Sequence, residues 1–118
     1  MSKLLLVEDN ILLLETTREL LEVLGHQVFP AANGQQARAA MAAHGSEIEL
    51  VLLDLSLPDV GGEELLGELA ASNANLKVVL CTGVLADDGL RRHPAVRGYL
   101  TKPFDLRELQ ETISQVLG

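Results

Sequence analysis

The sequence predicts a doubly wound α/β domain with a parallel sheet at its centre, and three observations lead to that prediction. Short apolar runs alternate along the chain with longer segments in which apolar residues recur at helical spacing. The short runs are apolar throughout, as expected for parallel strands that are covered on both faces. The 118 residues, 47% of them hydrophobic, are enough for one domain with a buried core.

The first strand–helix unit comes directly at the amino terminus. Lys3 to Val7 is a strand-like apolar run, and Ile11 to Leu24 has the apolar spacing of an amphipathic helix. Gly25 is expected to end this helix. The helix face that is expected to be buried consists of Leu13, Thr17, Leu20, Leu21 and Leu24.

The second and third units repeat this alternation. His26 to Ala31 predicts the second strand, and Asn33-Gly34 begins an alanine-rich helix that is expected to end near His44-Gly45. Leu50 to Leu53 is apolar throughout and predicts the third strand, and Gly62 to Ala71 predicts the third helix. The buried face of that helix is expected to consist of Leu65, Leu66 and Leu69.

The fourth and fifth units differ from each other. Val78 to Cys81 predicts the fourth strand, but Pro94 restricts the helix after it to a short or irregular one around Asp88 to Arg92. Val96 to Leu100 predicts the fifth strand, and Asp105 to Leu117 predicts the last helix, with Asp105 as its cap. The inner face of this helix is expected to consist of Leu106, Leu109, Ile113 and Val116.

Strands that alternate with helices form a parallel sheet with right-handed crossovers. Five such units predict the flavodoxin-like arrangement, with strand order 2-1-3-4-5 and helices on both faces. Ligand sites in this arrangement lie beyond the carboxyl ends of the strands, near the first and third strands, where the order reverses. Polar residues at these strand ends are therefore the candidates for a functional site.

Five polar residues come directly after predicted strands. Glu8 and Asp9 follow the first strand, Asp54 the third, Thr82 the fourth and Lys102 the fifth. Because parallel strands end at the same edge of a sheet, we expect these residues to converge on one rim. Three neighbouring carboxylates repel one another unless a cation or a proton intervenes, and hard oxygen ligands on an open rim suit Mg²⁺. Asp9 and Asp54 are the expected direct ligands, with Glu8 holding a metal-bound water.

This set of residues suits phosphoryl transfer. A carboxylate oxygen of Asp54 can attack phosphorus and form an acyl phosphate, which is a form of covalent catalysis. The reaction depends mainly on alignment and on neutralising the phosphoryl oxygens. We expect Lys102 to pair with one of these oxygens, Thr82 to donate a hydroxyl hydrogen bond to another, and Gly83 to leave the approach open.

Four stretches carry a family resemblance: Leu6-Val7-Glu8-Asp9-Asn10, Asp54 to Gly62, Thr82-Gly83 and Gly98 to Phe104. On these stretches the chain resembles, from Lys3 to Leu117, the receiver domain of two-component response regulators. The resemblance implies that Asp54 is the phosphoacceptor of a phosphorelay. A histidine kinase or histidine phosphotransfer domain would be the donor, and slow self-hydrolysis would follow.

The resemblance also implies a metal site and a conformational switch. The implied Mg²⁺ ligands are Asp9, Asp54, the backbone carbonyl of Ser56 and, mainly through water, Glu8. Thr82 and Tyr99 would form the pair that rearranges on phosphorylation, and the Lys102-Pro103 bond would be cis. The altered surface would then bind a downstream protein or a second copy of the chain.

Composition excludes several other classes. The formal charge of −8 and the isoelectric point of about 4.7 argue against direct binding to nucleic acid. No apolar run is long enough to span a bilayer, and the amino terminus has no signal-peptide cleavage site. The single cysteine, Cys81, cannot form an internal disulfide, so the cytoplasm is the expected location. We expect one receiver-like domain over residues 1–118, without an output domain and without a separate enzymatic activity.

Two alternative functions remain open from the sequence alone. A binding module with this fold would act without phosphorylation, but the intact Asp9, Asp54, Thr82 and Lys102 argue against it. An aspartyl-phosphate phosphatase usually shows a D-x-D pattern, and Ser56 stands where its second aspartate would be. Taken singly, most of these polar residues are better explained as helix caps, strand ends or surface side chains, and for Asp54 the two explanations are about equal. The functional interpretation depends on their meeting at one rim.

Overall fold

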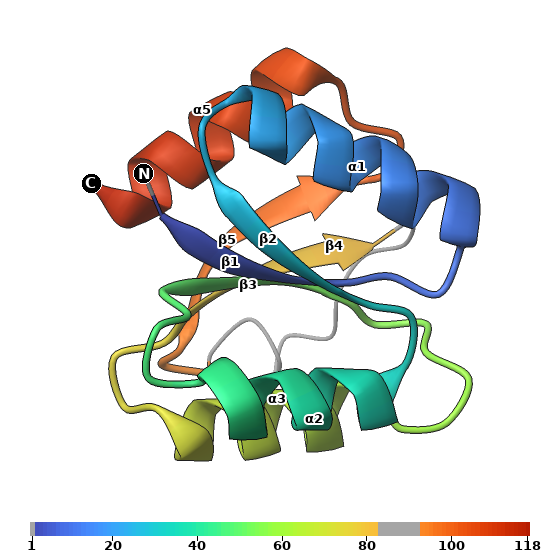
Figure 1. Cartoon of the computed structure of the whole chain (residues 1–118), viewed down its shortest axis with the longest axis vertical. Coiled ribbons are helices and arrows are strands. Elements are labelled where there is room, and N and C mark those ends of the chain that lie inside the picture. Colours follow the sequence, from blue (N-terminus) through green and yellow to red (C-terminus); the bar gives the residue numbers. More distant parts are fainter. Residues whose placement is uncertain (1, 83–92) are drawn as a thin grey trace.

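The computed structural model describes residues 2–82 and 93–118 and contains a five-stranded parallel sheet in the order β2-β1-β3-β4-β5 (Figure 1). The strands are β1 (Lys3–Val7), β2 (Gln27–Ala31), β3 (Leu50–Asp54), β4 (Lys77–Thr82) and β5 (Val96–Thr101). The helices are α1 (Ile11–Val23), α2 (Gly34–His44), α3 (Gly62–Ser72) and α5 (Leu106–Leu117). The predicted strand order is confirmed. The short fourth helix predicted around residues 88–92 lies outside the described residues.

Two layers of helices cover the sheet (Figure 1): α1 and α5 lie on one face, and α2 and α3 lie on the other. Successive side chains of a strand point to opposite faces, so one apolar run serves two cores. In β1, Leu4 and Leu6 pack in the core with α1 and α5, while Leu5 and Val7 pack in the core with α2 and α3. This double coverage explains why the central strands β1 and β3 carry no polar alternation. Among the described residues, no helix is long and apolar enough to cross a membrane.

Side-chain caps start three helices directly after the strand ends. Asn10, Asn33 and Asp105 each accept a hydrogen bond from the backbone N–H three residues further on, at 3.1, 2.8 and 2.8 Å. At the other end of α1, Gly25 adopts a φ of 97°, which only glycine takes up readily, so it ends the helix as predicted.

Two predicted helix faces need correction. Leu14, rather than Leu13, lies in the core beneath α1, together with the predicted Thr17 and Leu21. The error concerns this one residue, because the rest of the predicted face is in the right phase. In α5, Leu109 and Ile113 are buried as predicted, whereas Leu106 is 39% exposed. Leu106 is the first residue of its helix, where the pattern of the following turns is least informative.

Candidate functional site

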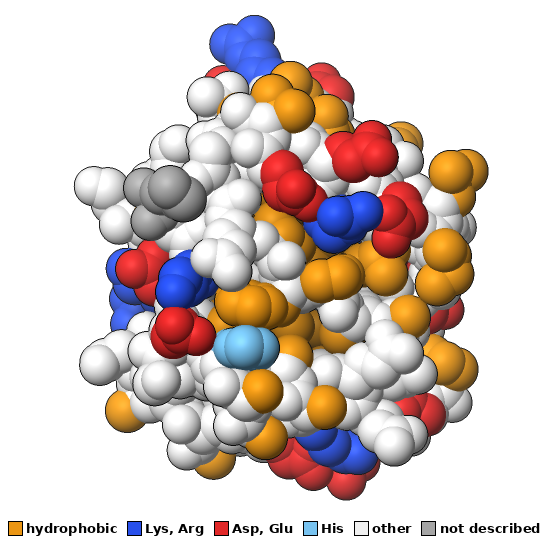
Figure 2. All heavy atoms as spheres, in the orientation of Figure 1, with side chains coloured by type: hydrophobic (Ala, Val, Ile, Leu, Met, Phe, Trp, Pro, Cys, Tyr) orange, Lys and Arg blue, Asp and Glu red, His pale blue; other side chains and the backbone are white. Residues whose placement is uncertain are grey.

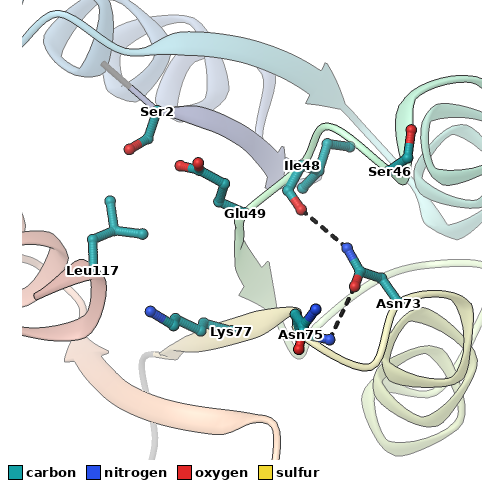
Figure 3. Close-up of a pocket in the computed structure, with 8 residues that line it drawn as sticks. All are labelled: Ser2, Ser46, Ile48, Glu49, Asn73, Asn75, Lys77 and Leu117. Carbon is teal, nitrogen blue, oxygen red and sulfur yellow. Dashed lines mark hydrogen bonds between the residues drawn. The ribbon is translucent and has the colours of Figure 1, made fainter.

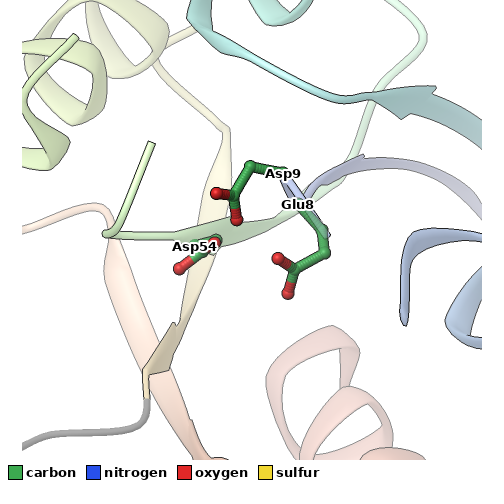
Figure 4. Close-up of side chains that lie close together, drawn as sticks. All are labelled: Glu8, Asp9 and Asp54. Carbon is green, nitrogen blue, oxygen red and sulfur yellow. The ribbon is translucent and has the colours of Figure 1, made fainter. Parts of the chain in front are cut away.

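Three carboxylates meet at the carboxyl edge of the sheet (Figure 4). The register of β1 and β3 pairs Val7 with Leu53, so the next residues, Glu8 and Asp54, emerge side by side. Asp9 follows in the loop before α1, and ligand oxygens of Glu8, Asp9 and Asp54 all lie within 4.8 Å of one another. The predicted convergence of these three acids is therefore confirmed.

Asp54 occupies the centre of this cluster and is only 2% exposed. Its Oδ1 accepts a hydrogen bond from the backbone N–H of Ser56 at 3.0 Å and lies 3.6 Å from Lys102 Nζ. Its Oδ2 is buried and has no hydrogen-bond partner within residues 2–82 and 93–118. A buried carboxylate oxygen without a partner is costly, which indicates a ligand that this structure does not include.

Lys102 comes from the end of β5 and pairs mainly with Glu8. Its Nζ lies 2.5 Å from Glu8 Oε1, much closer than it lies to Asp54. The second Glu8 oxygen accepts a hydrogen bond from the N–H of Asn10 at 3.1 Å. The sequence predicts Lys102 at this rim but does not predict its pairing with Glu8. The peptide bond between Lys102 and Pro103 is cis, as predicted.

Burial and neighbouring groups shift the pKa values of Glu8 and Asp54 in opposite directions. Burial raises the pKa of Glu8, against the smaller opposing effects of Lys102 and the Asn10 N–H. Burial also pushes the pKa of Asp54 upward, but the Ser56 N–H, the neighbouring carboxyls and Lys102 together lower it below its ordinary value. The pKa of Lys102 is raised, because Glu8 and Asp54 outweigh its burial. Of Glu8 and Asp54, Asp54 is therefore the carboxylate that loses its proton more readily, as suits a nucleophile or a metal ligand.

The donor set fits a hard divalent cation. Its side-chain donors are carboxylate oxygens, and Asp54 Oδ2 has no hydrogen-bond partner among the described residues. With all groups ionised, three carboxylates and one ammonium leave a charge of −3 + 1 = −2, which one divalent cation neutralises. Mg²⁺ usually keeps several waters and takes one or two carboxylates, which suits a site where Asp9 is exposed and Asp54 is buried.

Two of the predicted site residues lie at the limit of the described structure. Thr82 ends β4, where its backbone pairs with Thr101, but its side chain and all of Gly83 lie outside the described residues. Their predicted contacts with a phosphoryl group stay predictions. Tyr99, the other predicted switch residue, lies on β5 and is 40% exposed.

Two other features within residues 2–82 and 93–118, the Cys81 thiol and a pocket at the opposite edge of the sheet, do not compete with this site. Burial raises the pKa of the Cys81 thiol to about 12, so it is an inert core thiol, as predicted. A pocket at the opposite edge of the sheet is lined by Glu49, Lys77 and Asn73, among others (Figure 3). The Asn73 amide is already engaged there, because it donates to the Ile48 carbonyl at 3.4 Å and accepts from the Asn75 N–H at 2.9 Å. We therefore assign this pocket a structural role.

An Asp9→Asn variant is expected to unfold at higher temperature than wild type without metal, and to lose most of the stabilisation by Mg²⁺. The substitution removes like-charge repulsion with Glu8 and Asp54, but also a ligand oxygen. Free Mg²⁺ at about 100 times its Kd should stabilise wild type by about 2.7 kcal/mol. Thermal unfolding with and without Mg²⁺ measures both effects.

The control for this experiment is Glu19→Gln, which removes an exposed carboxylate on α1 that lies outside the cluster. This variant should respond to Mg²⁺ as wild type does. An equal Mg²⁺ response in Asp9→Asn and wild type would contradict the assignment of Asp9.

Comparison with known proteins gives one consistent result. The response regulator receiver domain family matches residues 4–114. Sporulation initiation phosphotransferase F of Bacillus subtilis is 30% identical over 118 residues, which cover 98% of this chain and 93% of that protein. Sensor kinase CckA of Brucella abortus is 33% identical over 115 residues, which cover 96% of this chain but 12% of the kinase. The chain spans about half the length of several transcriptional regulatory proteins that it also resembles.

Solved structures agree with this result. Response regulator protein TrrA from Thermotoga maritima, in complex with Mg²⁺ and BeF, is 27% identical with a TM-score of 0.81. The alignment covers 98% of this chain and 99% of that one. A receiver domain from Methylobacillus flagellatus is 31% identical with a TM-score of 0.84, and the alignment covers 98% of both chains.

Proposed function

This chain belongs to the response regulator receiver domain family, and from that premise we propose that it is a phosphoacceptor switch in which Asp54 is phosphorylated. The phosphoryl donor in this proposal is a phosphohistidine of a histidine kinase or a histidine phosphotransfer domain. The observation that supports it most is the state of Asp54. It is buried and its pKa is lowered, it lies close to two acids and a lysine, and within the described residues its Oδ2 has no hydrogen-bond partner.

In the proposed reaction a carboxylate oxygen of Asp54 attacks phosphorus. A P–O bond forms, and the P–N bond to the donor imidazole breaks with its electron pair returning to the nitrogen. Asp9, Asp54 and the backbone carbonyl of Ser56 would hold a Mg²⁺ ion. When bound, this ion would neutralise charge on the phosphoryl oxygens. The Ser56 N–H, 3.0 Å from Asp54 Oδ1, helps to keep the nucleophile ionised and oriented.

Lys102 must change partner during this reaction. Without a phosphoryl group its Nζ is held by Glu8 at 2.5 Å, with Asp54 Oδ1 3.6 Å away. A phosphoryl group on Asp54 brings up to two negative charges into reach of the ammonium. Lys102 would then pair with a phosphoryl oxygen, and Glu8, released from Lys102, would be available to accept a hydrogen bond from a water in the site. Slow hydrolysis of the acyl phosphate resets the switch.

Read-out follows from a shift between two conformations. In this proposal Thr82 moves toward the phosphoryl oxygens, and Tyr99 rotates into the space it leaves. A nearly complete shift of such an equilibrium takes on the order of 5 kcal/mol of differential stabilisation. One metal ion, the ion pair of Lys102 with a phosphoryl oxygen, and one or two hydrogen bonds together supply a stabilisation of that size. The altered surface then binds a downstream protein or a second copy of the chain, in the cytoplasm.

An apolar surface beside the site is where we propose that the donor protein docks. At the amino-terminal end of α1, Leu12 is 78% exposed, and hydrophobic side chains gather there (Figure 2). Leu13, Pro103 and Phe104 line an adjacent hollow of about 280 Å³ together with Lys102, so the surface is continuous with the phosphorylation site. A donor must place its histidine at that rim, and large exposed hydrophobic side chains are typical of such contacts.

A Leu12→Glu variant is therefore expected to accept phosphoryl groups from a protein donor at least about tenfold more slowly than wild type, because a charge is buried at the contact. Its reaction with a small acyl phosphate should be unchanged, since that donor needs no docking surface. The matched control is Val23→Glu at the other end of α1, where the side chain is 80% exposed. Equal rates for both variants with the protein donor would contradict docking at this surface.

One mass measurement tests the function itself. Wild type incubated with a small acyl phosphate and Mg²⁺ should gain the mass of a single phosphoryl group, and chelation of the metal should prevent it. No mass gain at full Mg²⁺ occupancy would instead support a binding module that acts without phosphorylation. Hydrolysis of many equivalents of the acyl phosphate would support a phosphatase.

A further inference from the structure

The loop between β3 and α3, residues 55–61, is hydrogen-bonded to the start of α2, the helix between β2 and β3. Asp59 in this loop accepts hydrogen bonds from the first two N–H groups of α2, from Gly34 at 2.8 Å and from Gln35 at 3.0 Å. These contacts join residues that lie 24 and 25 positions apart. The carboxylate meets the positive end of the helix dipole, and the N–H groups lower the pKa of Asp59.

Packing holds the loop at both of its ends. At Gly34 a Cβ atom would lie 2.2 Å from Cγ1 of Val60, so the first residue of α2 and the loop are in contact with no room between them. At Gly62 a Cβ atom would lie 2.6 Å from Cδ2 of Leu55. Val60 is itself buried in the core beneath α2 and α3. Because Gly34 and Gly62 have no side chains, the loop packs against the starts of α2 and α3 more closely than another residue at these positions would allow.

The same loop begins at the candidate site. Ser56, its second residue, donates its N–H to Asp54 Oδ1 at 3.0 Å, and its carbonyl is a proposed metal ligand. Asp59 lies three positions further along the chain, and we call its two hydrogen bonds to α2 the Asp59 clamp. The loop is therefore held at Asp54 by one hydrogen bond and at α2 by two.

We propose that Asp59 is a positioning residue for the Asp54 site. Its clamp on α2 holds Ser56 where this residue can contact the metal and the phosphoryl oxygens. The inference rests on the proposed function. When the ligands of a site are already in place before the metal binds, the binding free energy is not reduced by the cost of ordering the loop. Without the clamp, each binding event must also order residues 55–61.

The alternative role for Asp59 is that of a helix cap alone. However, α2 already has a cap, because Asn33 accepts the Gln36 N–H at 2.8 Å. The two residues therefore form a matched pair. Both satisfy N–H groups at the start of α2, but only Asp59 connects that helix to the loop of the site.

The experiment compares Asp59→Ala with Asn33→Ala, using Mg²⁺ alone as the probe and calorimetry or NMR titration as the measurement. Asp59→Ala should weaken Mg²⁺ binding by about tenfold or more, the usual effect of removing a group that orients metal ligands. Asn33→Ala should bind Mg²⁺ as wild type does. Asp59→Asn keeps one acceptor oxygen and should lie between wild type and Asp59→Ala.

Hydrogen exchange provides a second measurement that a simple cap would not affect. If the clamp couples the site to α2, adding Mg²⁺ should slow exchange of the Gly34 and Gln35 amides in wild type and in Asn33→Ala. Wild-type Mg²⁺ affinity in Asp59→Ala, or an equal loss in Asn33→Ala, would overturn the inference while leaving the proposed function intact. Failure of wild type to bind Mg²⁺ or to be phosphorylated would overturn both.

Discussion

An Asp54→Asn variant is expected to show no phosphoryl adduct under conditions that label wild type fully. The amide is nearly the same size, so the change leaves the packing around this 2% exposed side chain in place. It removes the buried carboxylate whose pKa is lowered, whereas the pKa of Glu8 is raised and Glu8 is paired with Lys102. Intact-protein mass spectrometry after incubation with an acyl phosphate and Mg²⁺ gives the result directly.

The control for this variant is Asp105→Asn, the same chemical change at the cap of α5. Asparagine caps a helix about as well as aspartate does, so this variant should fold and be labelled like wild type. A full adduct on Asp54→Asn would assign the phosphoryl group to another residue. Peptide mapping would identify that residue, and the proposed mechanism would then fail.

The fold was predictable because each strand carries its own signal. A run such as Leu4 to Val7 serves two cores at once, and its burial in the structure follows from that pattern alone. The alternation of strands and helices then predicts the sheet order, and the sheet order predicts which loops share an edge. The convergence of Glu8, Asp9 and Asp54 was predictable for this reason. It follows from topology and needs no knowledge of side-chain conformation.

The pairing inside the site was not predictable in the same way. Lys102 lies 94 residues from Glu8, and whether its ammonium meets Glu8 or Asp54 depends on side-chain reach over a few ångströms. The Asp59 clamp is similar: nothing local in the sequence says that a loop carboxylate faces the start of a helix 24 residues earlier. The error at Leu13 has another origin, since several neighbouring leucines leave open which of them faces the core.

A Lys102→Ala variant is expected to show two effects of opposite sign. Phosphoryl transfer to Asp54 should slow by about 10² or more, the usual cost of removing a group that stabilises charge in the transition state. Mg²⁺ should bind more tightly than in wild type, because the variant removes a positive charge that lies 2.5 Å from Glu8 and 3.6 Å from Asp54. Without metal, the variant should remain folded but be less stable, since Glu8 keeps a buried carboxylate without its partner.

These opposite signs separate the proposed role of Lys102 from a purely structural one. If Lys102 only held Glu8 and the β5 end in place, its loss would disorder the site, and both Mg²⁺ affinity and phosphoryl transfer would fall together. The control is Lys77→Ala at the opposite edge of the sheet, which makes the same change in net charge far from the cluster. Because it reproduces the charge change alone, any tightening of Mg²⁺ binding specific to Lys102→Ala reports direct competition between the ammonium and the metal for the same carboxylates.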